Sequence, residues 1–499
     1  TGSFRHGIFN KSFQLAPSFS YIHNNRWQLN ADFSVQHTDG VADRGQPGIL
    51  NNNNPHNTPN SLTVVQPGDY LKENDISAIF SFSYKINNHI SFNSSALVYV
   101  TAQQLAEHGI RGYITDDSVS LYYTHRTSNT FTLTLNNYVS FKFNTGKISH
   151  QLLTGYDFVT SAVDMNNFNG ELPSVYGAGS GIVGSFSLLH PEYINRPVNL
   201  YKQSTVLSDD AEAEEYSTHG IYVQDQVRLG KWQLLLGLRD EYYAGDQEDS
   251  AAAPPENIVL PRIGLVYKVN PSLNFYATYN KGFDPYEAGV TLQVFKEPFK
   301  PLYSELLEAG LKTDLFKNRV AATLAVYRLR VKNIAISAND PANPDLYVQR
   351  GLDQSVGIEG EVNGNILPNL SVAVSYAWNV AKIKESSKAD EVNMDKENAP
   401  RFSGSTWLKY TLGKTSLKGL SIFAGTTQQT KRNTLTKGFI LPGFTVIQAG
   451  LGYDYKRARI ALNVNNLFNS VYWVGGYNYA AKWPGTPRSF MINVEYMLR

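Results

Sequence analysis

Residues 370–379 read Leu-Ser-Val-Ala-Val-Ser-Tyr-Ala-Trp-Asn, and the fold class follows from their order. Large apolar side chains occupy every second position, and small or polar side chains occupy the positions between them. Successive side chains of a β-strand point to opposite faces of a sheet, so the stretch predicts a strand with one apolar and one polar face. The apolar face ends in Tyr376 and Trp378, aromatic residues of the kind that gather where a membrane meets water.

The same alternation recurs in 231–241, 445–455 and 489–498. Each apolar face is about nine or ten residues long, the length that a tilted strand needs to cross the hydrocarbon layer of a membrane. Strands of a soluble β-sandwich are shorter, about five or six residues, and their outer faces carry more charge. We therefore predict an all-β transmembrane antiparallel barrel, with lipid-facing rows headed by Leu234, Val372, Leu451 and Val494.

The connections between these strands alternate between tight turns and long polar segments, as in outer-membrane barrels. The tight turns are rich in Asn, Gly, Pro and Lys, and we place them at 24–25, 87–88, 144–146, 229–231, 270–272, 317–318, 367–369 and 455–457. The long segments are predicted to be structureless extracellular loops, and they span 38–75, 105–117, 165–214, 248–257, 283–300, 335–352, 384–399, 430–441 and 468–487.

This spacing gives about nineteen strands, whereas bacterial single-chain barrels close with an even number. If the last strand, 489–498, runs down to the periplasm, the first strand, near 11–22, also runs down, so an odd number of strands precedes residue 1. Three more would complete a barrel of the 22-stranded type, whose wide interior is blocked by a separate plug. Residues 1–499 are therefore expected to be the C-terminal barrel portion of a longer protein, with the plug and first strands upstream.

Composition excludes several other classes of protein. The 499 residues contain no run of about 18 apolar residues, so a helical membrane protein is not predicted. Aromatic residues make up 12% of the chain, too many for a disordered protein. Lys and Arg total 44 against 43 Asp and Glu, so a nucleic-acid partner is not expected. The absence of Cys removes disulfides, thiolate metal sites and thiol catalysis.

Motifs that mimic enzyme sites have simpler interpretations. Residues 179–184 match G-x-G-x-x-G, but a dinucleotide site needs this motif between a strand and a helix, and here it lies in a long loop. Residues 343–346 resemble a haem-receptor box by chance. The ten His show no H-E-x-x-H spacing, so no metal site is predicted. The acidic run 209–215 is interpreted as solvated, with cation bridging to lipopolysaccharide as the alternative.

The closing stretch 463–472, Asn-Val-Asn-Asn-Leu-Phe-Asn-Ser-Val-Tyr, with Gly-Tyr at 476–477 and Pro-Gly-Thr-Pro-Arg at 484–488, resembles the last two strands and last loop of the TonB-dependent receptors. The likeness is greatest to their ferric-siderophore (ferrichrome-type) branch. Two features depart from the family: Arg499 follows Leu498 where an aromatic residue usually ends the chain, and the plug with its energy-coupling box is missing. Further similar stretches cover nearly the whole chain, at 150–157, 279–285, 300–301, 308–312, 357–361 and 399–401.

The resemblance implies active import of a ferric siderophore across the outer membrane of a Gram-negative bacterium, energised by the TonB complex through the missing N-terminal region. It implies no enzymatic activity and no cofactor. Outer-membrane lipid and lipopolysaccharide are the expected surroundings. Haem, cobalamin or a glycan remain alternative ligands, and a passive porin-like channel or a soluble β-rich adhesin or lectin remain alternative functions.

Aromatic residues beyond the membrane span are the candidates for ligand binding. A ferric siderophore is bulky and partly apolar with exposed oxygens, and a rigid ring with a polar tip suits it. The resembled family points an aromatic of the last loop at the ligand, which here implies Trp483. The remaining candidates are Tyr477, Tyr479, Phe283 and Tyr286.

Overall fold

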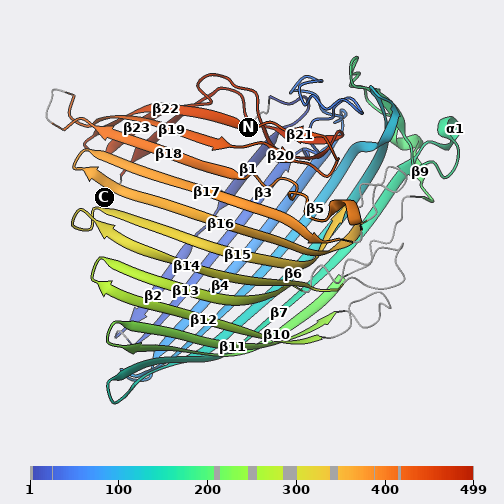
Figure 1. The fold of residues 1–499 in the computed structure, drawn as a ribbon. Coiled ribbons are helices and arrows are strands. Elements are labelled where there is room, and N and C mark those ends of the chain that lie inside the picture. The colour runs from blue at the N-terminus through green and yellow to red at the C-terminus, as the bar shows by residue number, and fades with distance from the viewer. Residues whose placement is uncertain are drawn as a thin grey trace.

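The structure is a computed structural model, and it describes residues 4–24, 26–206, 214–245, 256–284, 300–337, 347–386, 388–413 and 417–497. The chain folds almost entirely into antiparallel strands that curve round an interior, with short turns at one end and longer segments at the other (Figure 1). No helix in these ranges is long and apolar enough to cross a membrane.

Long strands form the curved wall, and they are β1 (Asn10–Leu15), β2 (Ser18–His23), β3 (Trp27–Gly40), β4 (Tyr70–Lys85), β5 (Ile90–Thr115), β6 (Ser118–Thr145), β7 (Ile148–Glu171), β10 (Glu214–Leu229), β11 (Trp232–Gly245), β12 (Glu256–Asn270), β13 (Leu273–Asp284), β14 (Leu302–Leu315), β15 (Val320–Ser337), β16 (Tyr347–Leu367), β17 (Leu370–Glu385), β18 (Phe402–Thr411), β19 (Leu420–Gln429), β22 (Phe444–Tyr455), β23 (Ala458–Asn465) and β26 (Ser489–Tyr496). Short elements lie between them: α1 (Pro173–Tyr176), β8 (Gly184–Ser187), η1 (Val198–Leu200), β9 (Lys202–Gln203), η2 (Ala389–Glu391), β20 (Arg432–Asn433), β21 (Ile440–Leu441), β24 (Trp473–Asn478) and β25 (Ala481–Pro484).

Within the described residues the main sheet contains 22 strands, but these strands do not form a closed barrel. The short strands β8 and β9 only extend the ends of β6 and β7, and β1 and β2 pair with β3 one after the other, as two halves of one strand. Nineteen wall strands remain, the number expected from the sequence. In the described part of the chain β26 does not pair with β1 or β2, so the wall has two open edges.

The alternation of side chains divides the wall into the two faces predicted. Ile422, Leu451, Leu462 and Ile492 are opposite one another on four neighbouring strands, with exposures of 39% to 70%. The other face carries the ring of Phe423, which fills the space beside Gly450.

The other predicted rows follow the same pattern with one exception. Leu236 and Leu238, in the row headed by Leu234, are exposed on β11. Val494 is exposed on the edge strand β26. Val372 shares a face with the exposed Leu408 but is itself buried, so it does not present its own surface to lipid.

Tight turns lie where the sequence predicts them. Asn24, Gly146, Gly230, Asn318 and Lys456 all have positive φ, a conformation that Asn and Gly adopt readily. The prediction of a loop over 105–117 is wrong. Strand β5 continues through Thr115, turns at 116–117 and returns as β6, because this polar stretch is paired and buried above the wall.

The longer segments are not structureless either, because several of them fold together over the end of β5 and β6. Residues 62–64, the β5–β6 hairpin and residues 183–201 bury a common apolar core, which we call the loop cap. Within it the ring of His108 contacts the Asp69 carboxylate at 2.7 Å. The core of the loop cap consists of Leu62, Val64, Ala106, Val119, Leu121, Tyr123, Val183, Phe186, Leu188 and Tyr201.

Candidate functional site

Segments from opposite ends of the chain meet above the two open edges of the wall. Gln46 and Lys482 pair through their backbones, and the indole nitrogen of Trp473 donates to the side-chain oxygen of Gln46 at 3.1 Å. The Gln46 amide in turn donates to Thr58 and to the carbonyl of Pro59. Gln46, Trp473 and Lys482 are 0% exposed, and we call this trio the clasp. The clasp joins the β3–β4 loop to the β23–β26 loop, although the strands on either side do not pair.

A third segment is attached to the clasp through Arg432. Its guanidinium donates to the carbonyl oxygens of Trp473 and Val474 and lies over the ring of Phe444. Arg432 is buried, and burial lowers the pKa of its guanidinium. The β19–β22 loop, which contains β20 and β21, is therefore held to the last loop by a cation whose partners are neutral carbonyls.

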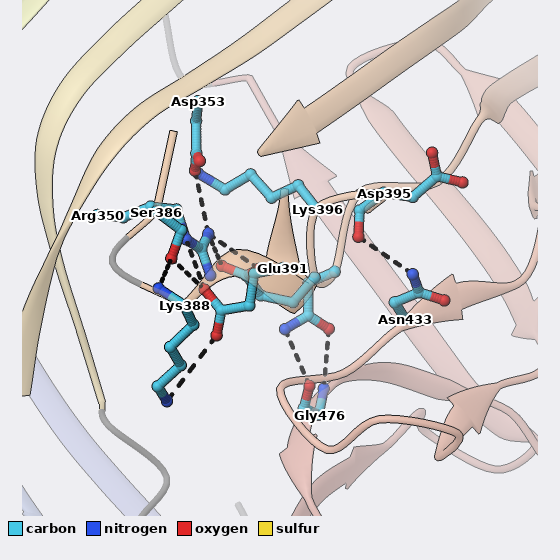
Figure 2. Close-up of polar contacts among 11 residues, drawn as sticks. Arg350, Asp353, Ser386, Lys388, Glu391, Asp395, Lys396, Asn433 and Gly476 are labelled. Atoms are coloured by element: carbon cyan, nitrogen blue, oxygen red, sulfur yellow. Dashed lines mark hydrogen bonds and ion pairs between the residues drawn. The ribbon is translucent and has the colours of Figure 1, made fainter. Parts of the chain in front are cut away.

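A network of charges fastens the β17–β18 loop to the first residues of β16 (Figure 2). The buried Arg350 guanidinium donates to Asp353 at 3.2 Å and to Glu397 at 3.1 Å, and Lys396 contacts Asp353 at 2.6 Å. Burial acts to lower the pKa of Arg350, but Glu397 and Asp353 outweigh it and raise the pKa. Buried charges of opposite sign that satisfy one another hold a loop in one position.

The same loop reaches the clasp through amide groups. Asn398 donates to the carbonyl of Gly476 at 2.9 Å and accepts from its N–H at 3.1 Å, and Asn433 donates to the carbonyl of Asp395 (Figure 2). Four loops therefore form one connected mouth over this part of the wall: the β3–β4, β17–β18, β19–β22 and β23–β26 loops.

Lys482 is the most unusual group in the mouth. Its ammonium nitrogen has no hydrogen-bond partner among the described residues. The nitrogen lies close to the backbone of Gly48, and a Cβ atom added to Gly48 would be only 2.8 Å from it. Burial, with a smaller contribution from the nearby Arg5 charge, lowers the pKa of Lys482 to about 7. A buried amine in apolar surroundings favours its neutral form.

The structure brings three of the predicted ligand-binding residues together beside the clasp. Trp483 donates through its indole nitrogen to the carbonyl of Asp43 at 3.2 Å, and its ring meets that of Tyr477 edge to face at 5.3 Å. The hydroxyl of Tyr479 donates to Asn53 at 2.7 Å. All three join the last loop to neighbouring rings or to the β3–β4 loop, and their contact with a ligand stays a prediction.

The other two predicted residues are not part of this group. Phe283 lies at the end of β13, where its ring packs with Tyr303 at 5.6 Å and against the buried Tyr243. Tyr286 lies outside the described residues.

The inner face of the wall is hollowed and carries polar and charged side chains among apolar ones. A cavity of about 580 Å³ runs along β10 to β14. In it Tyr276 donates to the Glu308 carboxylate at 2.7 Å, and the Lys312 ammonium lies 5.3 Å from the Tyr276 ring centre. The charged groups Glu308 and Lys312 favour water or a polar partner beside them, because burial against an apolar partner would remove their hydration.

The nucleotide-like motif at 179–184 is confirmed as a loop. The N–H groups of Gly179 and Gly181 donate to the carboxylate of Glu171 at 2.9 and 3.1 Å, so the amides that would hold a phosphate are already engaged. Burial acts to raise the pKa of Glu171, but these amides lower it overall. No cluster of His, Cys, Asp and Glu suited to a metal ion occurs within the described ranges. Residues 343–346 and most of the acidic run lie outside those ranges.

Sequence reasoning missed Gln46, Trp473, Lys482, Arg432 and Arg350. Each lies in a segment interpreted as loop or at its border, and the partners of the first three are more than 400 residues apart, as in the 427-residue separation of Trp473 and Gln46. Residue spacing carries no signal for such contacts.

A family profile described as TonB dependent receptor-like, beta-barrel matches residues 4–467. The chain belongs to this family. The family consists of receptors and transporters of the outer membrane, and the resemblance stated from the sequence is confirmed. The TonB-dependent receptor fold also explains the alternation of short turns and long loops round the wall.

Two curated relatives are named as a metal-pseudopaline receptor and a ferrioxamine B receptor. The metal-pseudopaline receptor CntO of Pseudomonas aeruginosa is 28% identical over 368 residues, which are 70% of this chain and 49% of that protein. The ferrioxamine B receptor of Salmonella typhimurium is 25% identical over 399 residues, 77% of this chain and 53% of that protein. The chain thus spans about half the length of these relatives.

Solved structures of TonB-dependent receptors share the fold. The ferric-catecholate import receptor Fiu from Escherichia coli K12 superposes with a TM-score of 0.79 at 19% identity, covering 99% of this chain and 75% of that one. The ferric preacinetobactin receptor BauA from Acinetobacter baumannii gives 0.83 at 16% identity, with 99% and 73% coverage. At sequence identities this low, the superpositions show a shared fold and no more.

Proposed function

We propose that this barrel belongs to a receptor that imports a ferric siderophore actively across the outer membrane, with energy from the TonB complex. The observation that carries the proposal is the family match over 4–467, together with relatives that are named as ferrioxamine B and metal-pseudopaline receptors. The wall supports it with exposed apolar rows outside and a hollowed face inside that carries polar and charged side chains among apolar ones. The mouth formed by four loops offers a place of capture at one end.

We further propose a barrel of the 22-stranded type with a plug in its interior. Two open edges support additional strands, because unpaired backbone groups in lipid cost several kcal/mol each, on the order of a lost hydrogen bond in hydrocarbon. The inner face, with the charged Glu308 and Lys312, supports a polar plug as its neighbour. The plug carries the contact with TonB in this proposal, and lipopolysaccharide surrounds the outer leaflet end of the wall.

Uptake measurements in the host bacterium test the proposal. The gene for the complete receptor is deleted and restored, and cells are given radiolabelled iron as a panel of ferric siderophores under iron restriction. We expect uptake of at least one complex to be lost on deletion, restored by the gene and abolished when TonB is inactivated. Uptake that persists without TonB would assign a passive channel, and uptake of haem, cobalamin or a glycan alone would assign another ligand.

A further inference from the structure

A small cavity of about 380 Å³ opens between the β17–β18 loop and the β19–β22 loop, next to the contacts drawn in Figure 2. Its size is within the usual range for sites that hold small molecules. It is formed by two segments that the Asn433 to Asp395 hydrogen bond holds together. Seven residues line it, and they are Asp395, Ala399, Arg401, Thr430, Lys431, Arg432 and Asn433.

The residues that line this cavity carry a net positive charge. Arg401, Lys431 and Arg432 contribute three cations, and Asp395 contributes the single carboxylate. That carboxylate is already shared, because Arg401 contacts it at 2.8 Å and Lys382 at 3.4 Å. These cations lower the pKa of Asp395 although burial acts to raise it, so the group is fully ionised at neutral pH and the lining still carries excess positive charge.

The positive charge of Arg432 is energetically unfavourable where it lies, because the side chain is buried without a carboxylate partner in the described part of the chain. The side chain is 3% exposed, its Nε has no hydrogen-bond partner among the described residues, and its other nitrogens bond only to the carbonyls of Trp473 and Val474. A buried cation without a carboxylate partner raises the electrostatic potential of the space beside it. The cavity beside Arg432 therefore attracts negative charge.

Neighbouring acids do not neutralise the cavity, because they are engaged elsewhere. Glu397 bonds to Arg350, and Asp390 approaches Lys437 at 4.0 Å on the outside of the loops. Lys431 also lines the cavity and is exposed to solvent.

We propose that this cavity binds a carboxylate-type anionic oxygen group of the imported complex, so that the receptor selects negatively charged ferric complexes over neutral or cationic ones. The inference rests on the proposed function and adds the charge class of the substrate. Arg432 supplies the buried charge, and the exposed Lys431 supplies a charged donor. Arg401 does not orient the anion, because its Nε and one terminal nitrogen already bind the carboxylate of Asp395.

Binding titrations of the complete receptor in detergent test the inference. The probes are ferric citrate, which is anionic, ferrichrome, which is neutral, and ferrioxamine B, which is cationic. We expect wild type to bind ferric citrate most tightly. The variant Lys431→Gln should weaken ferric citrate binding about fivefold, the size of one partly exposed charge pair, and leave any ferrichrome binding unchanged.

Lys437→Gln is the matched control, because Lys437 lies in the same loop with its side chain 76% exposed and does not line the cavity. This variant should bind every probe as wild type does. Arg432→Gln is a second test, with circular dichroism and heat resistance as folding checks, and in a folded sample it should lower ferric citrate affinity further.

Three outcomes overturn the inference. One is a receptor that binds a neutral or cationic complex more tightly than ferric citrate, which leaves the proposed import function intact. Another is equal loss in Lys431→Gln and Lys437→Gln. The third is tight binding of inorganic phosphate that ferric citrate does not displace, which would assign the cavity to a phosphate of the surrounding lipid or medium. Failure to bind any ferric complex counts against the proposed function itself.

Discussion

The indole nitrogen of Trp473 donates to the side-chain oxygen of Gln46 at 3.1 Å, and both side chains are completely buried. These residues belong to loops beside the two open edges of the wall, so one hydrogen bond links the loops on either side of the gap. The loops are therefore in contact across the gap, whereas the strands at its two edges do not pair.

Trp473→Phe should weaken the clasp without removing the aromatic ring that packs in it. The ring is kept, but Gln46 loses a donor to its buried oxygen, which costs about 1 to 3 kcal/mol. Hydrogen exchange should rise in 41–58 and 466–488 while the wall strands stay protected. Trp378→Phe, at an exposed position on β17, is the control and should change neither. Equal exchange in the two variants would contradict the role given to the clasp.

Leu451→Arg should cost about 2 to 4 kcal/mol in folding titrations of the complete barrel into bilayers, because the residue faces lipid near mid-span. Gly452→Ser should be nearly neutral, since a Cβ at Gly452 meets its nearest neighbours at an ordinary 3.8 Å on the inner face. A similar penalty at both positions would mean that the faces are reversed.

Lys482 should make the stability of the mouth depend on pH. Burial lowers its pKa from 10.5 to about 7 in the folded state, so between these values the unfolded loops bind more protons than the folded ones. Stability therefore rises with pH from about 7 to 10.5 and is level below that range, where both states are protonated. Thermal unfolding across pH should show this slope in wild type, and Lys482→Met should flatten it. A slope that is unchanged in the variant would exclude Lys482 as its source.

Trp483 has two roles that a pair of variants separates. If it stacks on the ferric complex, Trp483→Ala should weaken binding by about 1 to 3 kcal/mol in calorimetry and leave barrel yield unchanged. If it only fixes the loops, Trp483→Phe should already lower the melting temperature, because the bond to the Asp43 carbonyl is lost, while affinity holds. Unchanged affinity in Trp483→Ala, with complexes that wild type binds, would end the ligand proposal.

Residues 1–499 expressed alone should not yield a monomeric, heat-resistant barrel. Strands β26 and β1 with β2 present unpaired backbone edges, which promote aggregation in water and are not tolerated in lipid. Electrophoresis without boiling, after refolding in detergent, measures this directly. Addition of the upstream strands in one chain should restore a heat-resistant band, and a resistant band from 1–499 alone would contradict the 22-stranded proposal.

The wall could be predicted from the sequence because its signals are local. Alternation in 445–455 sets the two faces of β22, and the turn at 455–457 needs only the positive φ of Lys456. The β5–β6 extension could not be predicted, since Glu107 and His108 look like loop residues. His108 is buried where its ring contacts Asp69, and Glu107 is buried where it accepts hydrogen bonds from Arg44.

The candidate site was predicted only in its location. Trp483, Tyr477 and Tyr479 do gather at the mouth, because aromatic residues beyond a strand end are visible in one sequence. The groups that organise them are polar and buried, and Arg432 or Lys482 has no local pattern that separates it from a solvated loop cation. Their positions depend on which loops become neighbours when the wall curves.

Strands β5 and β6 pass through two different surroundings, the membrane below and the loop cap above. In the proposed barrel, lower parts of β5 and β6 face hydrocarbon, whereas Ala106, Val119 and Leu121 are buried from water above it. Only burial from water brings a large heat-capacity change, so the cap has a temperature of maximum stability that the lipid-facing wall lacks. Cooling should therefore weaken the cap's packing selectively, and a receptor of this design in a cold habitat meets its limit first at the surface it presents to the outside.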